Sequence, residues 1–214
     1  MEMKARSART KDAYSDGARP DQDLVAEVLG GRKAAFAELA TRHRAQVERL
    51  CRRFFVDREA VLDLVQESFM RAFTALAGYR AEMPFGGWLH AIVVNLCYDE
   101  LRRRRRRPEE LVGDFSAAEN EWLELVNHAT PEEIVAQAQE RREAYALAHQ
   151  LLATLRAEDR TVLVLKDGED LSVAEIAAML GWSESKVKIR AFRARKALRK
   201  HAERMLVARR AKDQ

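Results

Sequence analysis

A short stretch near the end of the sequence carries side chains suited to binding a polyanion. Between Glu184 and Lys200 it holds eight lysines and arginines against a single acid. The eight bases are Lys186, Lys188, Arg190, Arg193, Arg195, Lys196, Arg199 and Lys200. A merely solvated helix usually mixes positive and negative side chains, because like charges four residues apart repel each other. We therefore interpret this stretch as a helix that meets phosphates and base edges of a nucleic acid.

The residues just before this stretch predict a helix-turn-helix. Ser172 and Glu175 have the spacing of a capping box, which satisfies free amides at the start of a helix. Gly181 suits the left-handed turn that follows, and Ser183 can cap the second helix. The expected buried stripe of the second helix is Val187, Ala191, Ala194 and Leu198. In this motif the second helix enters the DNA major groove, so we expect duplex DNA binding.

A second basic cluster is the run Arg102–Arg107, which continues a helical pattern that starts near Trp88. Six consecutive arginines surround a helix on all sides, so they cannot all face one DNA strand. We expect Arg102 and at most two neighbours on its face to contact phosphates, and the remaining arginines to be solvated. Pro108 ends the pattern.

The overall composition predicts an all-α, soluble, cytoplasmic protein. Of 214 residues, 47% are hydrophobic and 34% are charged, with only nine glycines and four prolines for turns. No apolar run is long enough to span a membrane, and the N-terminus has no signal-peptide pattern. Cys51 and Cys97 lack partners at metal-site spacing, so we expect reduced thiols. The histidines are scattered and no nucleophile–base set or phosphate loop is present, so we expect no enzyme activity, metal or cofactor.

Charge and hydrophobic spacing divide the chain into five segments. We expect a mobile N-terminal tail at 1–20, a first helical domain at 21–107, a linker at 108–140, a second helical domain at 141–205 and a C-terminal tail at 206–214. The linker holds nine acids and no base, whereas both domains carry net positive charge. This distribution favours polyanion binding by both domains.

Apolar spacing predicts four helices in the first domain. The core positions of the first two are Leu24, Val25, Val28, Leu29, Phe36, Leu39, Val47, Leu50 and Phe54. Asp57 is expected to cap the third helix, which ends near Gly78. The predicted buried stripe of that third helix is Leu62, Val65, Phe69, Phe73 and Leu76. A loop then leads to the fourth helix, which we expect to begin near Trp88.

Three stretches, in this order, resemble the conserved regions of a known family. "DLVQESFMRAFTAL" resembles a region-2 helix that binds RNA polymerase, and "FGGWLHAIVVNLCYDELRRRRRR" resembles a promoter-melting helix. "LSVAEIAAMLGWSESKVKIRAFRARKALR" resembles a region-4 helix-turn-helix. The chain thus resembles the extracytoplasmic function (ECF) sigma factors, small bacterial transcription initiation subunits. The resemblance implies two helical domains, a region-2 bundle and a region-4 helix-turn-helix, joined by the acidic linker.

The resemblance also implies three binding surfaces. The surface for a coiled coil of the largest polymerase subunit is Asp63, Gln66, Glu67 and Met70. The surface for the melted minus-ten strand is Tyr79, Arg80, Phe85, Trp88, Asn95, Asp99, Arg102 and Arg103. The surface for the minus-thirty-five duplex is Ser183, Ser185, Lys186, Lys188, Ile189, Arg190, Arg193, Arg195 and Lys196. The aromatic residues of the second set could stack on a base or form core, and for Trp88 we favour the core.

Several residues depart from the usual family pattern. Gly86 stands where an arginine or another polar residue is common, and Lys186, Ile189 and Ala191 replace residues that are usual in the recognition helix. These changes leave the expected architecture intact, but they make any borrowed promoter consensus doubtful.

The expected partners are core RNA polymerase, promoter DNA as duplex and as melted single strand, and an anti-sigma factor, without membrane insertion. An alternative is a sigma-like decoy that sequesters an anti-sigma factor. Decoys usually add a receiver domain and lose the basic recognition helix, whereas this sequence has no receiver pattern and keeps eight bases there. A plain helix-turn-helix repressor would leave residues 57–107 unexplained. Two interpretations of the acidic linker stay open: it passes through the positively charged polymerase cleft, or it is a solvated tether between the two domains.

Overall fold

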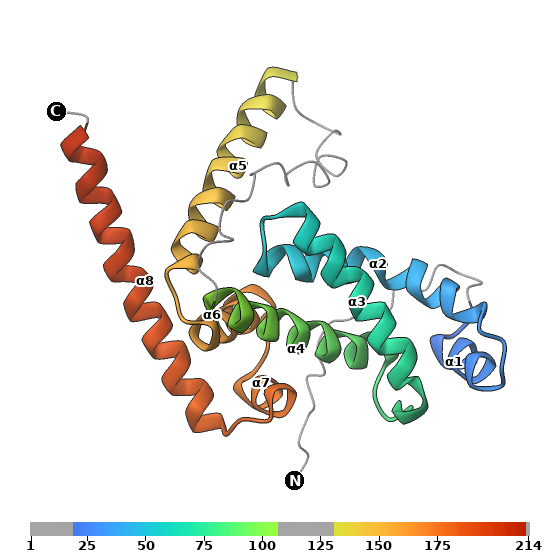
Figure 1. Ribbon diagram of the computed structural model, residues 1–214. Helices are drawn as coiled ribbons and strands as arrows, with labels where there is room; N and C mark the ends of the chain where they lie inside the picture. Colours follow the sequence, from blue (N-terminus) through green and yellow to red (C-terminus); the bar gives the residue numbers. More distant parts are fainter. Residues whose placement is uncertain (1–18, 107–130, 213–214) are drawn as a thin grey trace, which may run out of the picture. The chain divides into compact units, whose positions relative to one another are not determined.

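The computed structural model describes residues 19–106 and 131–212, and all regular elements within these ranges are helical (Figure 1). The expectation of an all-α fold is confirmed. The expected N-terminal tail as far as residue 18 and the acidic segment 108–130 lie outside the described residues. No helix within the described ranges is long and apolar enough to cross a membrane.

The elements follow one another through short connections. The first described range contains α1 (Asp21–Leu29), α2 (Ala35–Phe54), α3 (Arg58–Ala75), the 3-10 turn η1 (Leu76–Gly78) and α4 (Phe85–Arg106). The second contains α5 (Pro131–Ala153), α6 (Ala157–Leu163), the π-helical turn η4 (Val164–Gly168), α7 (Val173–Leu180) and α8 (Glu184–Lys212). Helix α5 therefore starts inside the segment that the sequence assigns to the linker, and α8 continues through the expected tail to Lys212.

Contacts between Cα atoms divide the chain into two compact units. Unit 1 comprises Met1–Cys51 with Leu62–Cys97, and unit 2 comprises Arg52–Val61 with Tyr98–Gln214. The boundary falls within α2, α3 and α4 and not in the acidic segment. The domain limits expected from the sequence therefore stay a prediction.

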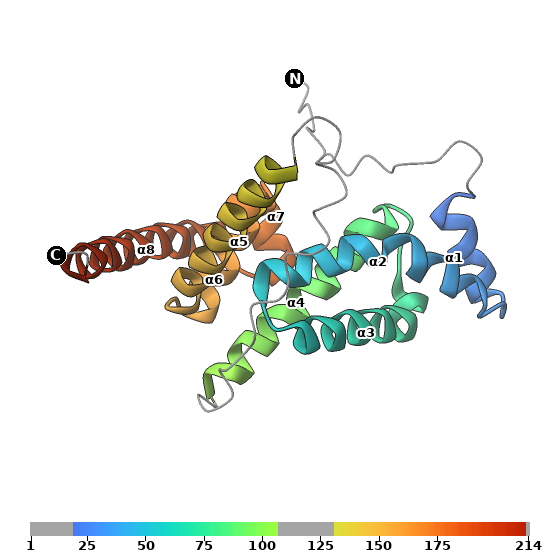
Figure 2. The same cartoon turned by 90° about the horizontal axis from the view of Figure 1, so that it is seen from above.

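The core of unit 1 is built from the apolar faces of its helices. Helices α2 and α3 run side by side and antiparallel (Figure 2), since Phe36 near the start of α2 meets Phe73 near the end of α3, with ring centroids 5.1 Å apart. Most of the expected core residues of α1 and α2 are buried; in unit 1 these are Leu24, Val25, Val28, Leu39, Val47 and Leu50, and Phe54 is buried in the last turn of α2, which belongs to unit 2. Leu29 is an exception at 55% exposure, because α1 ends there and the chain turns away at Gly30.

The expected buried stripe of α3 is partly wrong. Val65 and Leu76 are buried, but Leu62 and Phe73 are 41% and 37% exposed, and Phe69 is only half-buried. The buried face of α3 instead consists of Val61, Leu64, Val65, Ser68 and Ala72, and Leu76 of η1 continues it. Ser68 and Ala72 are completely buried, and such small side chains let neighbouring helices approach closely. The larger side chains are therefore displaced to the flank of α3.

Helix α4 begins three residues earlier than expected, at Phe85. The carbonyl of Pro84 accepts hydrogen bonds from the amides of Gly87 and Trp88, at 3.0 and 3.1 Å. Gly86 and Gly87 thus lie in the first helical turn, although two adjacent glycines weaken a helix on propensity alone. Burial of Phe85 at 2% exposure offsets that cost.

The helix-turn-helix of unit 2, formed by α7 and α8 (Figure 1), agrees with the sequence at its caps and its turn. The amide of Glu175 donates to Ser172, and the Glu175 carboxylate accepts from the Ser172 amide, so the capping box is present. Gly181 has a left-handed conformation with φ of 63°, and Ser183 accepts from the amide of Lys186 at 3.2 Å. Val187, Ala191 and Ala194 are buried as expected, while Leu198 is only half-buried.

Candidate nucleic-acid and protein interfaces

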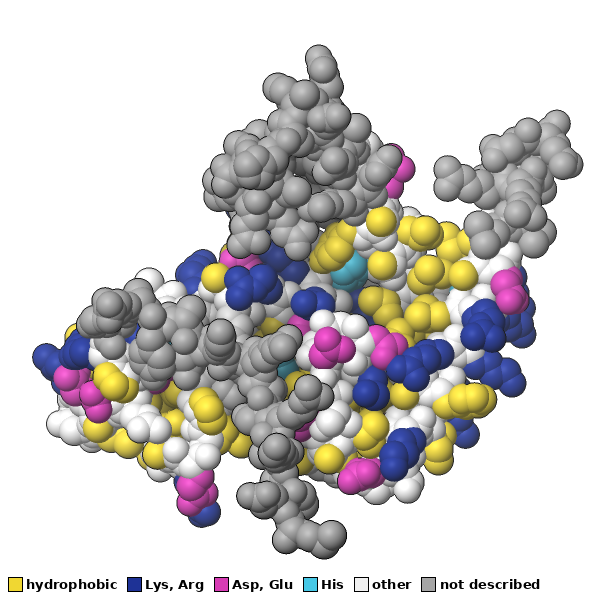
Figure 3. Space-filling view, turned by 180° about the vertical axis from the view of Figure 1, so that it is seen from behind, with side chains coloured by type: hydrophobic (Ala, Val, Ile, Leu, Met, Phe, Trp, Pro, Cys, Tyr) yellow, Lys and Arg dark blue, Asp and Glu magenta, His cyan; other side chains and the backbone are white. Residues whose placement is uncertain are grey.

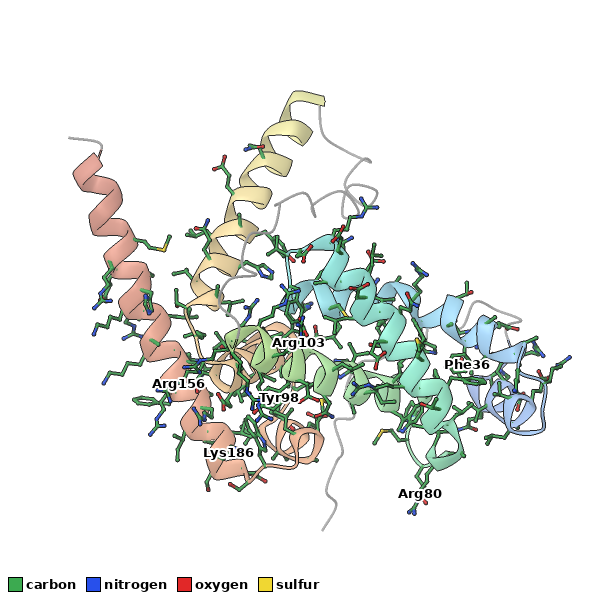
Figure 4. The ribbon with its side chains drawn as sticks, in the orientation of Figure 1. Phe36, Arg80, Tyr98, Arg103, Arg156 and Lys186 are labelled. Carbon is green, nitrogen blue, oxygen red and sulfur yellow. The ribbon has the colours of Figure 1, made fainter. Side chains whose placement is uncertain are left out.

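An open groove of about 610 Å³ lies between α2 and α3 in unit 1. Its lining residues are Phe36, Arg44, Leu62, Val65, Gln66, Phe69, Met70 and Phe73. Phe36, marked in Figure 4, packs edge-on against Phe73 at one end of the groove. Met70 is the most exposed of the apolar side chains among them, at 56%. A groove of large apolar side chains left open to solvent fits the apolar face of a partner helix.

The four residues expected to bind polymerase divide into two groups. Gln66 and Met70 line the groove, whereas Asp63 and Glu67 lie next to them on the exposed side of α3. Glu67 is half-buried and pairs with Arg71 at 2.7 Å. The acids therefore form a polar rim, and the apolar side chains form the floor.

Sequence reasoning missed Phe36, Leu62 and Phe73 as groove residues and assigned them to the core. A usable signal was present in α3. Its helix carries Val61, Leu64, Val65, Ala72 and Leu76, which already fill one buried stripe. The additional large apolar residues exceed what a single stripe can hold, which indicates a second apolar surface.

The loop Tyr79–Pro84 joins η1 to α4 and is stabilised by an aromatic cluster. The Tyr79 hydroxyl donates to the carbonyl of Met83 at 2.6 Å, and its ring lies 5.3 Å from Trp88 and 5.8 Å from Phe85. Phe85 is buried, which fits the core alternative for this residue: its ring packs against Tyr79 and Trp88 and anchors the loop. Tyr79 and Trp88 are half-buried, and Arg80 extends from the loop (Figure 4).

The outer face of α4 carries the remaining residues expected to meet a single strand. Asn95, Asp99 and Arg102 are all exposed and recur at steps of four and three, so they share one helix face. Asp99 and Arg102 line a polar hollow of about 530 Å³ together with Arg103 and Arg106. Asn95 donates one hydrogen bond to the carbonyl of Ala91 at 2.9 Å.

Two arginines of the run are held by the protein itself. Both Arg103 and Arg104 bind the Glu100 carboxylate through their Nε atoms at 2.7 Å, and the Arg104 guanidinium lies 5.0 Å from the ring centroid of Phe55. Burial would raise the pKa of Glu100, but the hydrogen bonds from both arginines outweigh burial and lower it. Arg104 is therefore part of the fold, and Arg102, Arg105 and Arg106 are the exposed members together with Arg103.

The outer face of α8 carries most of the expected duplex-binding side chains. Eight of the nine predicted residues are exposed, and seven of these eight point to solvent without a partner in another described element: Ser183, Ser185, Lys186, Lys188, Ile189, Arg193 and Lys196. The Lys186 ammonium lies 3.7 Å from the ring centroid of Trp182, and Lys188 pairs with Glu184 at 3.5 Å. Seen from behind, dark-blue side chains follow the course of α8 (Figure 3). The face presents cations to solvent, as a phosphate-binding surface requires.

The other two predicted residues are engaged within unit 2. Arg190 is half-buried and pairs with the buried Asp159 of α6 at 3.2 Å. Arg195 is exposed, but it donates to Asp167 of η4 at 3.1 Å, and this hydrogen bond raises its pKa. DNA contact by Arg190 therefore stays a prediction, and the pair with Asp159 argues for a structural role. A count of the charges along α8 could not detect these ion pairs, because the two acids lie in other elements, Asp159 in α6 and Asp167 in η4.

Phe192 is a surface residue that sequence reasoning missed. Its side chain is 68% exposed, and it lies off the buried stripe on the same side of α8 as Lys196 and Ile189, itself 51% exposed. Apolar side chains in the major groove contact thymine methyl groups. Within the described residues no group of His, Cys, Asp and Glu gathers as metal ligands would.

Two family models match the chain in sequence order. Residues 39–107 match sigma-70 region 2, and residues 145–198 match sigma-70 region 4. The RNA polymerase sigma-H factor of Pseudomonas aeruginosa is 34% identical over 84% of this chain and 92% of its own length. The ECF RNA polymerase sigma-E factor of Haemophilus influenzae is 32% identical over 82% and 91%.

Solved structures with a similar fold include a chain from the complex of CnrH with the cytosolic domain of CnrY. Its TM-score is 0.56 at 27% identity, covering 86% of this chain and 97% of that one. A chain from the co-crystal of the sigma factor RpoE with the anti-sigma factor NepR from Bartonella quintana has a TM-score of 0.52. At 17% identity, over 78% of this chain and 96% of that one, it supports the fold alone.

The matched regions contain the structural features described above. Region 2 includes most of the α2–α3 groove and the exposed face of α4, and region 4 includes the helix-turn-helix with the basic part of α8. Members of this family are transcription initiation factors and not enzymes. Because both regions match and the relatives are similar over most of their length, the chain belongs to the ECF family of RNA polymerase sigma factors.

Proposed function

We propose that this chain binds core RNA polymerase and directs it to promoters that contain minus-ten and minus-thirty-five elements. The observation that carries the proposal is the outer face of α8, where Lys188, Arg193 and Lys196 are exposed beside the apolar Ile189 and Phe192. Cations on such a face bind phosphates, and apolar side chains between them read base edges in the major groove.

In this proposal the α2–α3 groove is the polymerase contact. The apolar floor takes the hydrophobic face of a helix from the largest polymerase subunit, and Asp63 and Glu67 at the rim fix its orientation. An interface with an apolar centre and a charged rim is the usual arrangement for a stable protein complex. Such a factor acts where the polymerase and the chromosome are, in the cytoplasm.

The minus-ten contact is assigned to the loop Tyr79–Pro84 and to the exposed face of α4. A base that leaves the duplex stack loses its stacking energy, and an aromatic ring such as Tyr79 can replace it. Asn95 and Arg102 lie further along α4 and can follow the sugar-phosphate chain of the same strand. Both side chains are already exposed, so this contact requires no rearrangement of the core.

Run-off transcription with purified core polymerase and genomic promoter fragments tests the proposal. Addition of the chain should produce specific transcripts whose start sites share two upstream elements. A Met70→Asp variant should lose this activity, whereas Leu29→Asp should keep it, because Leu29 is equally exposed but does not line the groove. Absence of both core binding and specific initiation by the unmodified chain would refute the proposal.

The second candidate is a decoy that binds an anti-sigma factor in place of promoter DNA. The similar RpoE structure named above contains the anti-sigma factor NepR, so a protein of this fold occurs in such a complex. A decoy, however, has no need for a solvent-exposed cationic face on the recognition helix. We therefore favour the initiation factor, and we propose an anti-sigma factor as a regulatory partner of it.

A further inference from the structure

Unit 1 contains a buried ionic cluster that the proposed function does not use. His43 of α2 and Asp21 at the start of α1 are 7% and 9% exposed, and the His43 Nε2 and Asp21 Oδ2 atoms are 2.7 Å apart. Arg42 donates to the other carboxylate oxygen at 2.6 Å and to Glu38 at 2.9 Å. Burial alone would raise the pKa of Asp21, but the hydrogen bonds from His43 and Arg42 outweigh it and lower that pKa. The carboxylate is thus held in its charged form.

Such a cluster is a costly way to hold two helices together. Replacing a buried ion pair with apolar residues of similar size often leaves a protein equally stable or more stable. A buried pair of this kind fixes a direction more precisely than an apolar contact, because a hydrogen bond has narrow limits of distance and angle.

The His43 ring lies against the anchor of the loop Tyr79–Pro84. Its centroid is 5.2 Å from that of Phe85, which in turn contacts Tyr79 and Trp88. Phe85 is buried and contacts both His43 and the half-buried rings of Tyr79 and Trp88. A shift of the His43 ring would therefore move Phe85 and, with it, those two rings. The Tyr79 hydroxyl then closes the loop on the Met83 carbonyl.

Two further observations show that α1 and α2 lie close to this loop and to the start of α4. A Cβ atom on Gly86 would lie 3.3 Å from the His43 Cε1 atom, so a larger residue there would push the His43 ring by a few tenths of an ångström. Gln22 of α1 reaches the loop directly, with its amide nitrogen 3.5 Å from the carbonyl of Ala81. The loop is therefore supported from α1, α2 and α4 together.

We propose that the Asp21–His43 pair is a positioning device for strand capture: it fixes Phe85 and thereby presents Tyr79 and the loop Tyr79–Pro84 in the shape that accepts an unstacked base. The proposal rests on the assignment of this loop to the melted minus-ten strand. Neither Asp21 nor His43 touches the nucleic acid. Both act through the aromatic cluster.

Two adjacent glycines provide a matched test. Gly86→Ala places a methyl group against the His43 ring, whereas Gly87→Ala meets only the flexible Met83 side chain at 3.5 Å, an ordinary contact. Both substitutions lie in the same helical turn and carry the same propensity gain. The probe is a single-stranded oligonucleotide with the minus-ten sequence selected in run-off transcription, carrying 2-aminopurine at each position in turn. It is added to the polymerase holoenzyme.

The Gly86→Ala holoenzyme should bind this strand about tenfold more weakly, the loss expected when one stacked base is released. The change in 2-aminopurine fluorescence that binding causes at that base should become smaller. Gly87→Ala should bind within about twofold of the unmodified holoenzyme. His43→Ala should behave like Gly86→Ala, and His43→Gln should recover much of the affinity because its amide can still donate to Asp21.

Core affinity and thermal unfolding of each variant separate positioning from general stability. Strand binding that falls while core affinity is unchanged supports the proposal. Strand binding equal to that of the unmodified protein in Gly86→Ala and His43→Ala overturns it, as does a loss that only parallels a loss of core affinity. If the unmodified holoenzyme bound no single strand at all, the result would refute the proposed minus-ten contact itself, on which the positioning role depends.

Discussion

The α2–α3 groove and the outer face of α8 are two exposed surfaces built on opposite physical principles. The groove is floored by large apolar side chains such as Leu62, Met70 and Phe73, with charge only at its edge. The face of α8 is covered by cations with two apolar residues among them. Apolar burial hardly depends on salt, whereas phosphate contacts weaken steeply as salt rises. One chain can thus remain bound to a protein partner while it samples DNA weakly and reversibly.

The largest effect is expected from a charge placed in the groove. Met70→Asp would bury an unpaired carboxylate against the partner helix, and we expect about a 100-fold loss of core affinity, as for a central contact residue. Binding of duplex DNA by α8 should be unchanged. Fluorescence anisotropy with labelled protein measures the first quantity, and Leu29→Asp serves as the control for an exposed apolar site outside the groove. Equal losses in both variants would mean that the groove is not the contact.

A smaller effect is expected from removal of one exposed cation on α8. Arg193→Ala should weaken duplex binding about fivefold to tenfold and make the salt slope shallower by about 1, because one phosphate contact is lost. Filter binding between low and moderate salt provides both values.

Arg190→Ala is the matched control for that substitution. It leaves Asp159 buried without its partner, so it should lower the free energy of unfolding and change the salt slope little. A salt slope that falls equally for Arg190→Ala and Arg193→Ala would contradict the division of α8 into paired and exposed cations.

Phe192→Ala tests the apolar part of the same face. We expect about a fivefold loss of affinity for the selected duplex, the effect of one methyl contact in the major groove, with no change in salt slope. Affinity for an unrelated duplex should stay the same. The ratio of the two affinities is the relevant measurement, and a ratio equal to that of the unmodified protein would remove Phe192 from base readout.

The smallest effect is expected at the rim of the groove. Asp63→Lys changes a solvent-exposed charge that does not line the groove, so core affinity should fall only about threefold. The loss should be larger at low salt than at high salt. A loss as large as that of Met70→Asp would show that electrostatics, and not apolar burial, dominates this contact.

The two surfaces also differ in how far the sequence predicts them. The helix-turn-helix is signalled by neighbours in the chain, such as Ser172 with Glu175 and the turn at Gly181, so its local structure could be predicted residue by residue. The groove depends on which face of α3 meets the other helices. Hydrophobicity marks Leu62 and Phe73 as apolar, but it cannot say whether another helix covers them.

Tertiary contacts explain the remaining differences. Arg190 has the same charge as Arg193 in sequence, yet Asp159, 31 residues away, engages only Arg190. Phe85 could equally have been a stacking residue, but it is buried and its ring packs against that of His43, 42 residues earlier in the chain. Neither contact can be predicted from the spacing of apolar residues along the sequence. The residue types of both surfaces were foreseeable, and the division between exposed and engaged residues was not.

The most direct test of the contrast is the dependence of affinity on salt for the unmodified chain, measured with core polymerase and with selected promoter duplex in the same buffers. The logarithm of duplex affinity should fall steeply with the logarithm of salt concentration, with a slope that reflects several released counterions. The slope for core polymerase should be less than half as steep. Equal slopes would contradict the account, because they would mean that both surfaces bind through charge.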